Sequence, residues 1–150
     1  MPKGEVIFLA RNLAHNLAEQ DFYEEDPGLK AVVATDDEDM LFELIIETNL
    51  SETAVREALK KIHQEEMILE IVIEGELSDD LISYALQLIS DQRRIMIKIF
   101  SLVGEKTIRI RKLAAQRITS KDCLLSISRM ESNESIREIC KKKLSNICSA

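Results

Sequence analysis

Apolar and polar positions follow the same pattern in two consecutive segments of the chain. The segments DMLFELIIETNLSETAVREALKKI (39–62) and EMILEIVIEGELSDDLISYALQLI (66–89) align without gaps and are identical at nine of 24 positions. Most of the other positions are apolar in both or polar in both. A fixed period of about 20–50 residues is the signature of stacked supersecondary units. We therefore interpret the two segments as copies of one unit.

The second half of each unit has the spacing of an amphipathic helix. Ser51 and Ser78 stand where an N-cap is expected, because a side-chain oxygen there accepts a bond from a free backbone N–H. The inward positions that follow recur at i, i+3, i+4 and i+7. They are Val55, Ala58, Leu59 and Ile62 in one unit, and Ile82, Ala85, Leu86 and Ile89 in the next.

The first half of each unit permits two structures. The run MILEIVIEG (67–75) is rich in β-branched residues, and short apolar runs cannot be assigned by their period alone. A strand followed by a helix is therefore an open alternative. The carboxylates favour a helix, because Glu43 and Glu47, like Glu70 and Glu74, would then lie on one narrow polar stripe.

The pattern continues with looser spacing as far as residue 147. A third apolar helix is expected to end at Gly104, which suits a helix C-terminus. Thr119 and Asp122 have the spacing of a capping box at the start of the next helix. The predicted units are 38–62, 66–89, 91–118 and 119–147.

Residues 1–37 match the unit poorly, as terminal capping units usually do. They are predicted to hold a helix from Val6 to about Gln20, a turn at EEDPG (24–28) and a short helix that extends up to Ala34. We interpret this region as an N-terminal cap.

Three of the second-half segments share a further motif. AVREALKKI (54–62), RIRKLAAQRI (109–118) and SIREICKKKL (135–144) place an apolar–Arg pair near the helix start, followed by small or aliphatic residues. Over about residues 38–147 this resembles the second helix of HEAT-like repeats, although Ser83 replaces the arginine in the second unit. The period of about 27 is nearer to that of the compact leucine-rich-repeat variant. The resemblance implies an all-α fold, a right-handed α-solenoid of short two-helix units.

Composition agrees with one soluble, cytoplasmic helical domain. Of 150 residues, 45% are hydrophobic and 31% charged, and only four are glycine and two proline. The apolar run EVIFLA (5–10) is too short for a signal segment, and none is long enough to span a membrane. Cys140 falls on an apolar stripe, so a reduced, buried thiol is expected rather than a disulfide.

Charge divides the chain into two parts of opposite sign. Residues 1–90 contain 21 acidic and six basic residues, whereas residues 91–150 contain six acidic and 14 basic ones. The net charge of −7 hides this asymmetry. Such a division indicates surfaces that attract charged partners.

Catalytic and metal-binding motifs are not found. The only histidines, His15 and His63, are too few for a metal site, and no phosphate-binding loop or nucleophile motif occurs. The four stripe glutamates allow a carboxylate cluster for a hard cation, but no calcium-loop pattern accompanies them. We therefore expect no enzymatic activity, no cofactor and no metal.

The function expected from this pattern is protein–protein interaction, because stacked units present equivalent residues in rows. Stacking at the repeat period would place Glu43 beside Glu70, and Glu47 beside Glu74. The row would then become basic at Lys98 and Arg94. The expected partner-binding residues are Glu43, Glu47, Glu70, Glu74, Arg94, Lys98, Arg111 and Arg117.

Two kinds of partner follow from the charges. A protein with a basic surface would complement the acidic row, and a second copy of the chain could supply it by docking head to tail. The alternative is nucleic-acid binding through the basic region 93–121, which could neutralise phosphates. Against it, the last aromatic residue is Phe100, so a stacking platform is missing.

Overall fold

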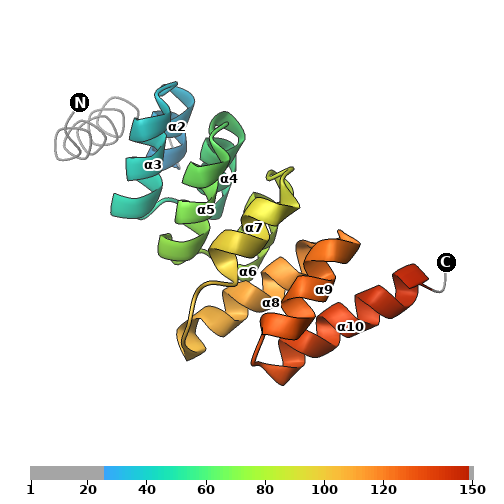
Figure 1. The fold of residues 1–150 in the computed structure, drawn as a ribbon. Helices are drawn as coiled ribbons and strands as arrows, with labels where there is room; N and C mark the ends of the chain where they lie inside the picture. Colours follow the sequence, from blue (N-terminus) through green and yellow to red (C-terminus); the bar gives the residue numbers. More distant parts are fainter. Residues whose placement is uncertain (1–25, 149–150) are drawn as a thin grey trace. The chain divides into compact units, whose positions relative to one another are not determined.

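The computed structural model describes residues 26–148, which form nine α-helices and one 3-10 helix (Figure 1). By its internal contacts the chain divides into two compact units, residues 1–76 and 77–150, and each is described by itself. The all-α prediction is confirmed for the described residues, and the alternative of a strand in the first half of each repeat is wrong for them. The helix predicted from Val6 to about Gln20 lies outside the described residues.

The first unit contains four described helices. They are α2 (Pro27–Val33), α3 (Glu38–Glu47), α4 (Glu52–Lys61) and α5 (Glu65–Glu74). Helix α4 packs against α2 and α3, and α3 also packs against α5. The helix predicted to extend up to Ala34 is confirmed as α2, whose C-cap is Ala34.

The second unit contains five helices and the 3-10 turn. They are α6 (Asp79–Gln87), α7 (Gln92–Ile99), η1 (Glu105–Thr107), α8 (Ile108–Arg117), α9 (Lys121–Met130) and α10 (Glu134–Cys148). Helix α8 packs against α6, α7 and α10, whereas α9 packs against α7 and α10. Alternate helices as well as consecutive ones therefore share the core.

In the segments 39–62 and 66–89 the core includes the apolar stripes that the spacing predicts. All eight inward residues of the two amphipathic helices, from Val55 to Ile62 and from Ile82 to Ile89, are buried. The apolar helix α5 buries Ile68, Leu69, Ile71 and Val72, which lie on more than one of its faces. Its β-branched residues are tolerated in a helix because tertiary packing outweighs their weak helix propensity.

Two of the predicted caps are confirmed and two helix boundaries are corrected. The Ser51 and Ser78 side chains accept the N–H groups of residues 54 and 81 at 3.1 and 3.3 Å. The N-cap of α9 is Ser120 rather than Thr119. Helix α7 ends at Ile99, before Gly104, whose φ of 103° places it in a turn.

Lysine and arginine side chains bind the C-terminal carbonyl groups of neighbouring helices. In the first unit, Lys61 Nζ at the end of α4 donates to the carbonyl oxygens of Val32, Val33 and Thr35 at 2.9, 3.1 and 2.7 Å. These oxygens lie at the end of α2, where the last turn has no intrahelical donors. A charged donor also complements the negative end of the helix dipole.

The second unit contains two contacts of the same kind. Arg117 at the end of α8 donates to the carbonyl oxygens of Leu86 and Ile89 at the end of α6, both at 3.1 Å. Lys143 of α10 donates to the carbonyl oxygens of Ala115, Gln116 and Ile118 at the end of α8. We call Lys61, Arg117 and Lys143 the carbonyl-binding cations.

Helix N-termini receive equivalent help from side chains at the start of other helices. Glu38, the first residue of α3, accepts the N–H groups of His63 and Gln64 before α5, at 2.7 and 3.2 Å. Gln92, the first residue of α7, accepts the N–H groups of Thr119 and Ser120 before α9, at 2.7 and 2.8 Å. Neighbouring helices thus bind the C-terminal ends of α2, α6 and α8 and the N-terminal ends of α5 and α9.

Replacement of Lys61 by methionine tests the carbonyl-binding cations. Lys61→Met keeps the aliphatic stem but leaves three carbonyl oxygens without their charged donor, so the free energy of unfolding should fall by about 1–3 kcal/mol. The adjacent Lys60 forms an exposed pair with Glu57, so Lys60→Met should change it by less than about 0.5 kcal/mol. Urea denaturation followed by circular dichroism measures both; equal losses would contradict the assignment.

A separate prediction concerns the pH dependence of stability that arises from Cys140, whose side chain is fully buried in α10. Burial raises the pKa of its thiol; the Lys143 ammonium lowers this pKa, and the Glu131 carboxylate raises it further. The unfolded chain therefore loses the thiol proton first, so the stability from this group is intact below about pH 8.5 and decreases as pH rises to the folded pKa. Cys140→Ala should flatten that decrease in urea unfolding between about pH 8.5 and 10. If the free energy of unfolding fell equally with pH in both proteins, the raised pKa of Cys140 would be contradicted.

Candidate interaction surface

Three of the four glutamates in the predicted acidic row reach the solvent. Glu47 lies on α3, and Glu70 and Glu74 lie on the neighbouring helix α5; all three are exposed. Glu43 is different, because only 3% of it is accessible. It lies inside the first unit and offers no surface to a partner there.

The predicted change of the row from acidic to basic at Lys98 does not follow from the helix register. Helices α3, α5 and α7 have N-caps at Asp37, Gln64 and Asp91. The sixth position after these caps holds Glu43, Glu70 and Ile97, and Lys98 is one position further, which is a rotation of about 100° on a helix. The structure therefore gives α7 an apolar residue at this register, and Ile97 is 62% exposed. Arg94 and Lys98 are half-buried.

Arg111 is a buried structural residue, with 8% of it accessible. Its Nη1 forms an ion pair with Oε1 of Glu131, which is also buried, and its Nε lies 3.3 Å from Thr107 Oγ1. The same Glu131 oxygen accepts the N–H of Asn133 at 3.1 Å. This network joins α8 to the loop before α10, so Arg111 is not available to a partner.

The basic region 93–121 is only partly available as a surface. Arg117 is half-buried and bound to two carbonyl oxygens, as described above. Arg109 is exposed, but its Nε pairs with Asp79 Oδ1 at 3.1 Å and its Nη2 donates to the Leu77 carbonyl at 2.8 Å. The exposed cations of this region are thus fewer than the sequence suggests, which does not favour the nucleic-acid alternative.

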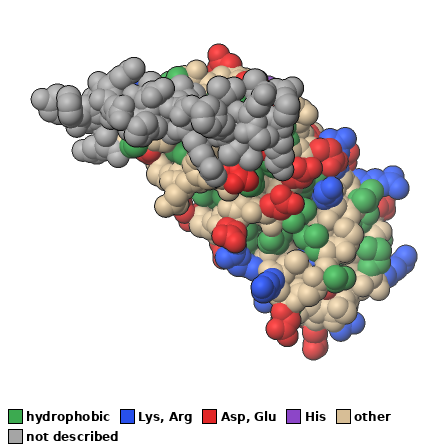
Figure 2. Space-filling model, turned by 90° about the vertical axis from the view of Figure 1, so that its left-hand side faces the viewer, with side chains coloured by type: hydrophobic (Ala, Val, Ile, Leu, Met, Phe, Trp, Pro, Cys, Tyr) green, Lys and Arg blue, Asp and Glu red, His purple; other side chains and the backbone are tan. Residues whose placement is uncertain are grey.

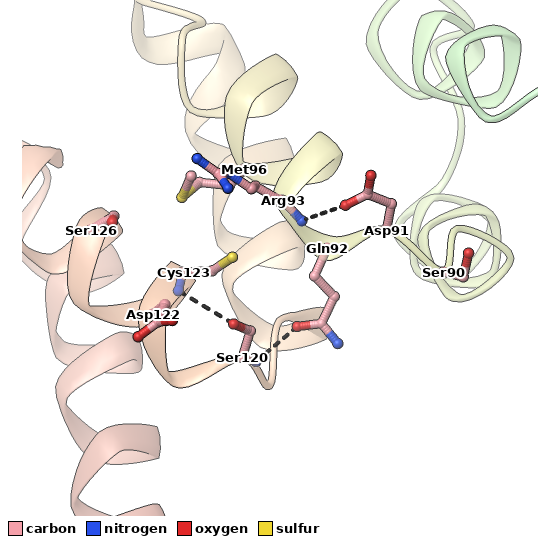
Figure 3. Close-up of a pocket in the computed structure, with 9 residues that line it drawn as sticks. All are labelled: Ser90, Asp91, Gln92, Arg93, Met96, Ser120, Asp122, Cys123 and Ser126. Atoms are coloured by element: carbon pink, nitrogen blue, oxygen red, sulfur yellow. Dashed lines mark hydrogen bonds between the residues drawn. The ribbon is translucent and has the colours of Figure 1, made fainter.

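A cleft of about 560 Å³ lies between the N-terminal ends of α7 and α9 (Figure 3). Its lining includes Gln92, Arg93 and Met96 on the α7 side and Ser120, Asp122, Cys123 and Ser126 on the α9 side. Sequence reasoning did not identify it, because its residues come from two segments about 30 positions apart and belong to no motif.

Backbone N–H groups at the cleft already have acceptors. Asp91 Oδ1 accepts from the N–H groups of Arg93 and Arg94 at 3.1 and 3.2 Å. Ser120 Oγ accepts from the N–H of Cys123 at 3.4 Å. Gln92 Oε1 accepts from the N–H groups of Thr119 and Ser120. The chemistry offered to a ligand is therefore that of side chains, which include the thioether of Met96, the guanidinium of Arg93, the hydroxyl of Ser126 and the carboxylate of Asp122.

Hydrophobic side chains are also exposed in the second unit. Besides Ile97, Met130 at the end of α9 is 63% exposed and Val103 in the turn before η1 is 87% exposed. On the face drawn in Figure 2, hydrophobic side chains (green) reach the solvent between acidic (red) and basic (blue) ones. Contiguous apolar groups bordered by charges are typical of protein-binding surfaces, whereas single exposed apolar residues are common on any protein.

Within residues 26–148, no three side chains of histidine, cysteine, aspartate or glutamate are grouped so that they could hold a metal ion. None of the helices in this range has the length and apolar character needed to cross a membrane. Comparisons with protein-family models, curated proteins and solved structures found no match for the chain.

The structural role assigned to Arg111 has a direct test. Arg111→Met leaves the Glu131 carboxylate buried without its cation, so the free energy of unfolding should decrease by about 3–5 kcal/mol. The double variant Arg111→Met, Glu131→Gln removes that charge and keeps an acceptor for Asn133, so it should recover most of the loss. Urea unfolding measures both; a single variant that loses less than about 1 kcal/mol would show that the pair is dispensable.

Proposed function

We propose that this chain is a non-enzymatic interaction module that binds a protein with a basic surface. In this proposal the helices form a HEAT-like, right-handed solenoid of two-helix units, in which side chains at the helix ends hold the frame. The outward positions on the first helix of each unit, namely α3, α5 and α7, then select the partner. The buried thiols of Cys123 and Cys140 suit a reducing, cytoplasmic location.

The observation that carries the proposal is the exposed acidic row of Glu47, Glu70 and Glu74 on two packed helices. Glu70 and Glu74 lie one turn apart on α5, where like charges repel by a few tenths of a kcal/mol, roughly, so the row has a small cost. The described part of the first unit, residues 26–76, contains 14 acidic and four basic residues, which strengthens the negative potential around the row. A basic partner would relieve the repulsion and gain from the field.

Charge reversal tests the proposal. The triple variant Glu47→Lys, Glu70→Lys, Glu74→Lys should fold, because all three side chains are exposed, and should lose the basic proteins that the unaltered chain retains from a lysate. The matched control is Glu52→Lys, Glu76→Lys, Asp80→Lys, which changes net charge equally at exposed positions outside α3 and α5. Quantitative mass spectrometry measures recovery. If both triple variants lose the same proteins, only net charge matters and the proposed site is wrong.

The partner in this proposal can be a second copy of the chain, whose residues 91–150 are basic. Head-to-tail docking would then give a ring or an open filament, according to whether the rotation closes. Light scattering at low salt should show masses above the 17.1 kDa of one chain, and these should fall as salt screens the contact. A mass of one chain at both salt concentrations would exclude self-association and leave a different basic protein as the partner.

A further inference from the structure

We propose that the outward face of α7, together with the cleft between α7 and α9, binds a short amphipathic helix that carries apolar anchor residues and acidic flanks. This inference rests on the proposed function, because it adds a second surface to the same interaction module. It concerns other residues and a partner of the opposite charge, so the two proposals can fail separately.

Helix α7 has two apolar faces, although only one of them belongs to the core. Ile95 and Ile99 are fully buried and form the inner face. On the other side, the basic Arg93 is followed by the apolar residues Met96, Ile97 and the C-cap Phe100 at the spacing i, i+3, i+4 and i+7, which is one continuous stripe. A second apolar stripe on a helix that is already packed indicates a surface meant for another chain.

The exposure of this outer stripe is what distinguishes α7. Ile97 is 62% exposed, and Met96 and Phe100 are half-buried. At the fifth position after the N-cap, where α7 has Met96, α3 and α5 bury Phe42 and Leu69. Helix α7 therefore leaves Met96 half-buried and the adjacent Ile97 exposed, whereas Phe100 is half-buried like its counterparts Ile46 and Ile73.

The cleft extends this apolar surface toward α9. In Figure 3 the Cys123 sulfur projects from α9 toward α7, and the Met96 side chain lies on the α7 side of the same space beside Arg93. A volume of about 560 Å³ can receive one or two aliphatic or aromatic side chains. Thioether groups adapt to differently shaped partners, so Met96 suits a site for a peptide side chain.

Charge identifies the occupant as acidic. At the second and sixth positions after the N-cap, α5 carries Glu66 and Glu70, whereas α7 carries Arg93 and Ile97. Helices α7 and α9 with their N-caps contain five basic and two acidic residues. Arg93, Lys121 and Arg129 are exposed, whereas Arg94 and Lys98 are half-buried. Asp91, which caps α7, and Asp122 line the cleft together with Arg93.

The shape of the stripe identifies the occupant as a helix of a few turns. Arg93 and Phe100 are seven positions apart, which is about 10 Å along the axis of α7. An amphipathic helix laid along such a stripe contacts it through residues spaced i, i+3 or i+4 and i+7, and its flanking carboxylates would face Arg93, which is exposed at the cleft.

A displayed library of random peptides of about 15 residues, selected on the full chain, tests the proposal. Enriched sequences should combine helix-spaced apolar residues with aspartate or glutamate. A fluorescein-labelled enriched peptide should bind Ile97→Ser about tenfold more weakly than the unaltered chain, because an apolar contact is lost. Val33→Ser is the matched control: Val33 is 64% exposed on α2, and its replacement should leave the affinity unchanged. Arg93→Glu should weaken binding several-fold and reduce its salt dependence.

Circular dichroism confirms that each variant is folded before affinity is compared. The variant with lysine at positions 47, 70 and 74 should bind the acidic peptide as well as before, whereas Ile97→Ser should retain the basic proteins of the first test. A lack of enriched peptides, enrichment of basic ones, or equal affinity for Ile97→Ser and Val33→Ser would overturn the inference. Displacement of the peptide by a labelled single-stranded oligonucleotide at about 0.15 M salt would also overturn it, since the surface would then be a nucleic-acid site.

Discussion

The structure depends on how its short helices satisfy their ends. Each helix leaves up to four N–H and four C=O groups without intrahelical partners, and in helices of eight to ten residues such groups are a large share of the backbone. Isolated helices of this length are unstable in water. Here Lys61, Arg117 and Lys143 bind the carbonyl ends, and Glu38 and Gln92 bind the N–H ends. Secondary structure and tertiary packing are thus stabilised by the same contacts.

In our proposal, the residues that bind the helix ends are separate from those that contact a partner. The carbonyl-binding cations are partly buried and bind backbone atoms, so each such position requires a cationic side chain of suitable length. The outward positions of α3, α5 and α7 differ from one another in charge and polarity. They are carboxylates at Glu47, Glu70 and Glu74, but an arginine and an isoleucine at Arg93 and Ile97. In our proposal these differences select the partner of each surface.

Sequence periodicity predicts the core well because burial in a helix follows spacing. The stripes that include Leu59 and Leu86 and the caps Ser51 and Ser78 were predictable for this reason. Burial of Glu43 was not, because Glu70 has the same residue type and register and yet is exposed. Register alone does not specify what covers each position.

Two other differences between the sequence predictions and the structure could have been anticipated from the sequence. Arg111 occupies the inward register that Val55 and Ile82 hold in other helices, and an arginine there requires a buried carboxylate, which the structure supplies as Glu131. The approximate period places Lys98 at the register of Glu43 and Glu70. Counting six positions from the N-cap Asp91 places Ile97 there instead. The cleft at α7 and α9 had no such signal, since it depends on tertiary packing.

The central claim is that a basic partner meets the row on α3 and α5 rather than the acidic residues in general. Amide chemical shifts of the full chain, titrated with a lysine-rich peptide, test this claim most directly. The account predicts that shifts concentrate at Glu47, Glu70 and Glu74 and saturate together. Equal shifts at Glu52 and Glu76, without saturation, would contradict it, because they would show unspecific attraction to a negatively charged protein.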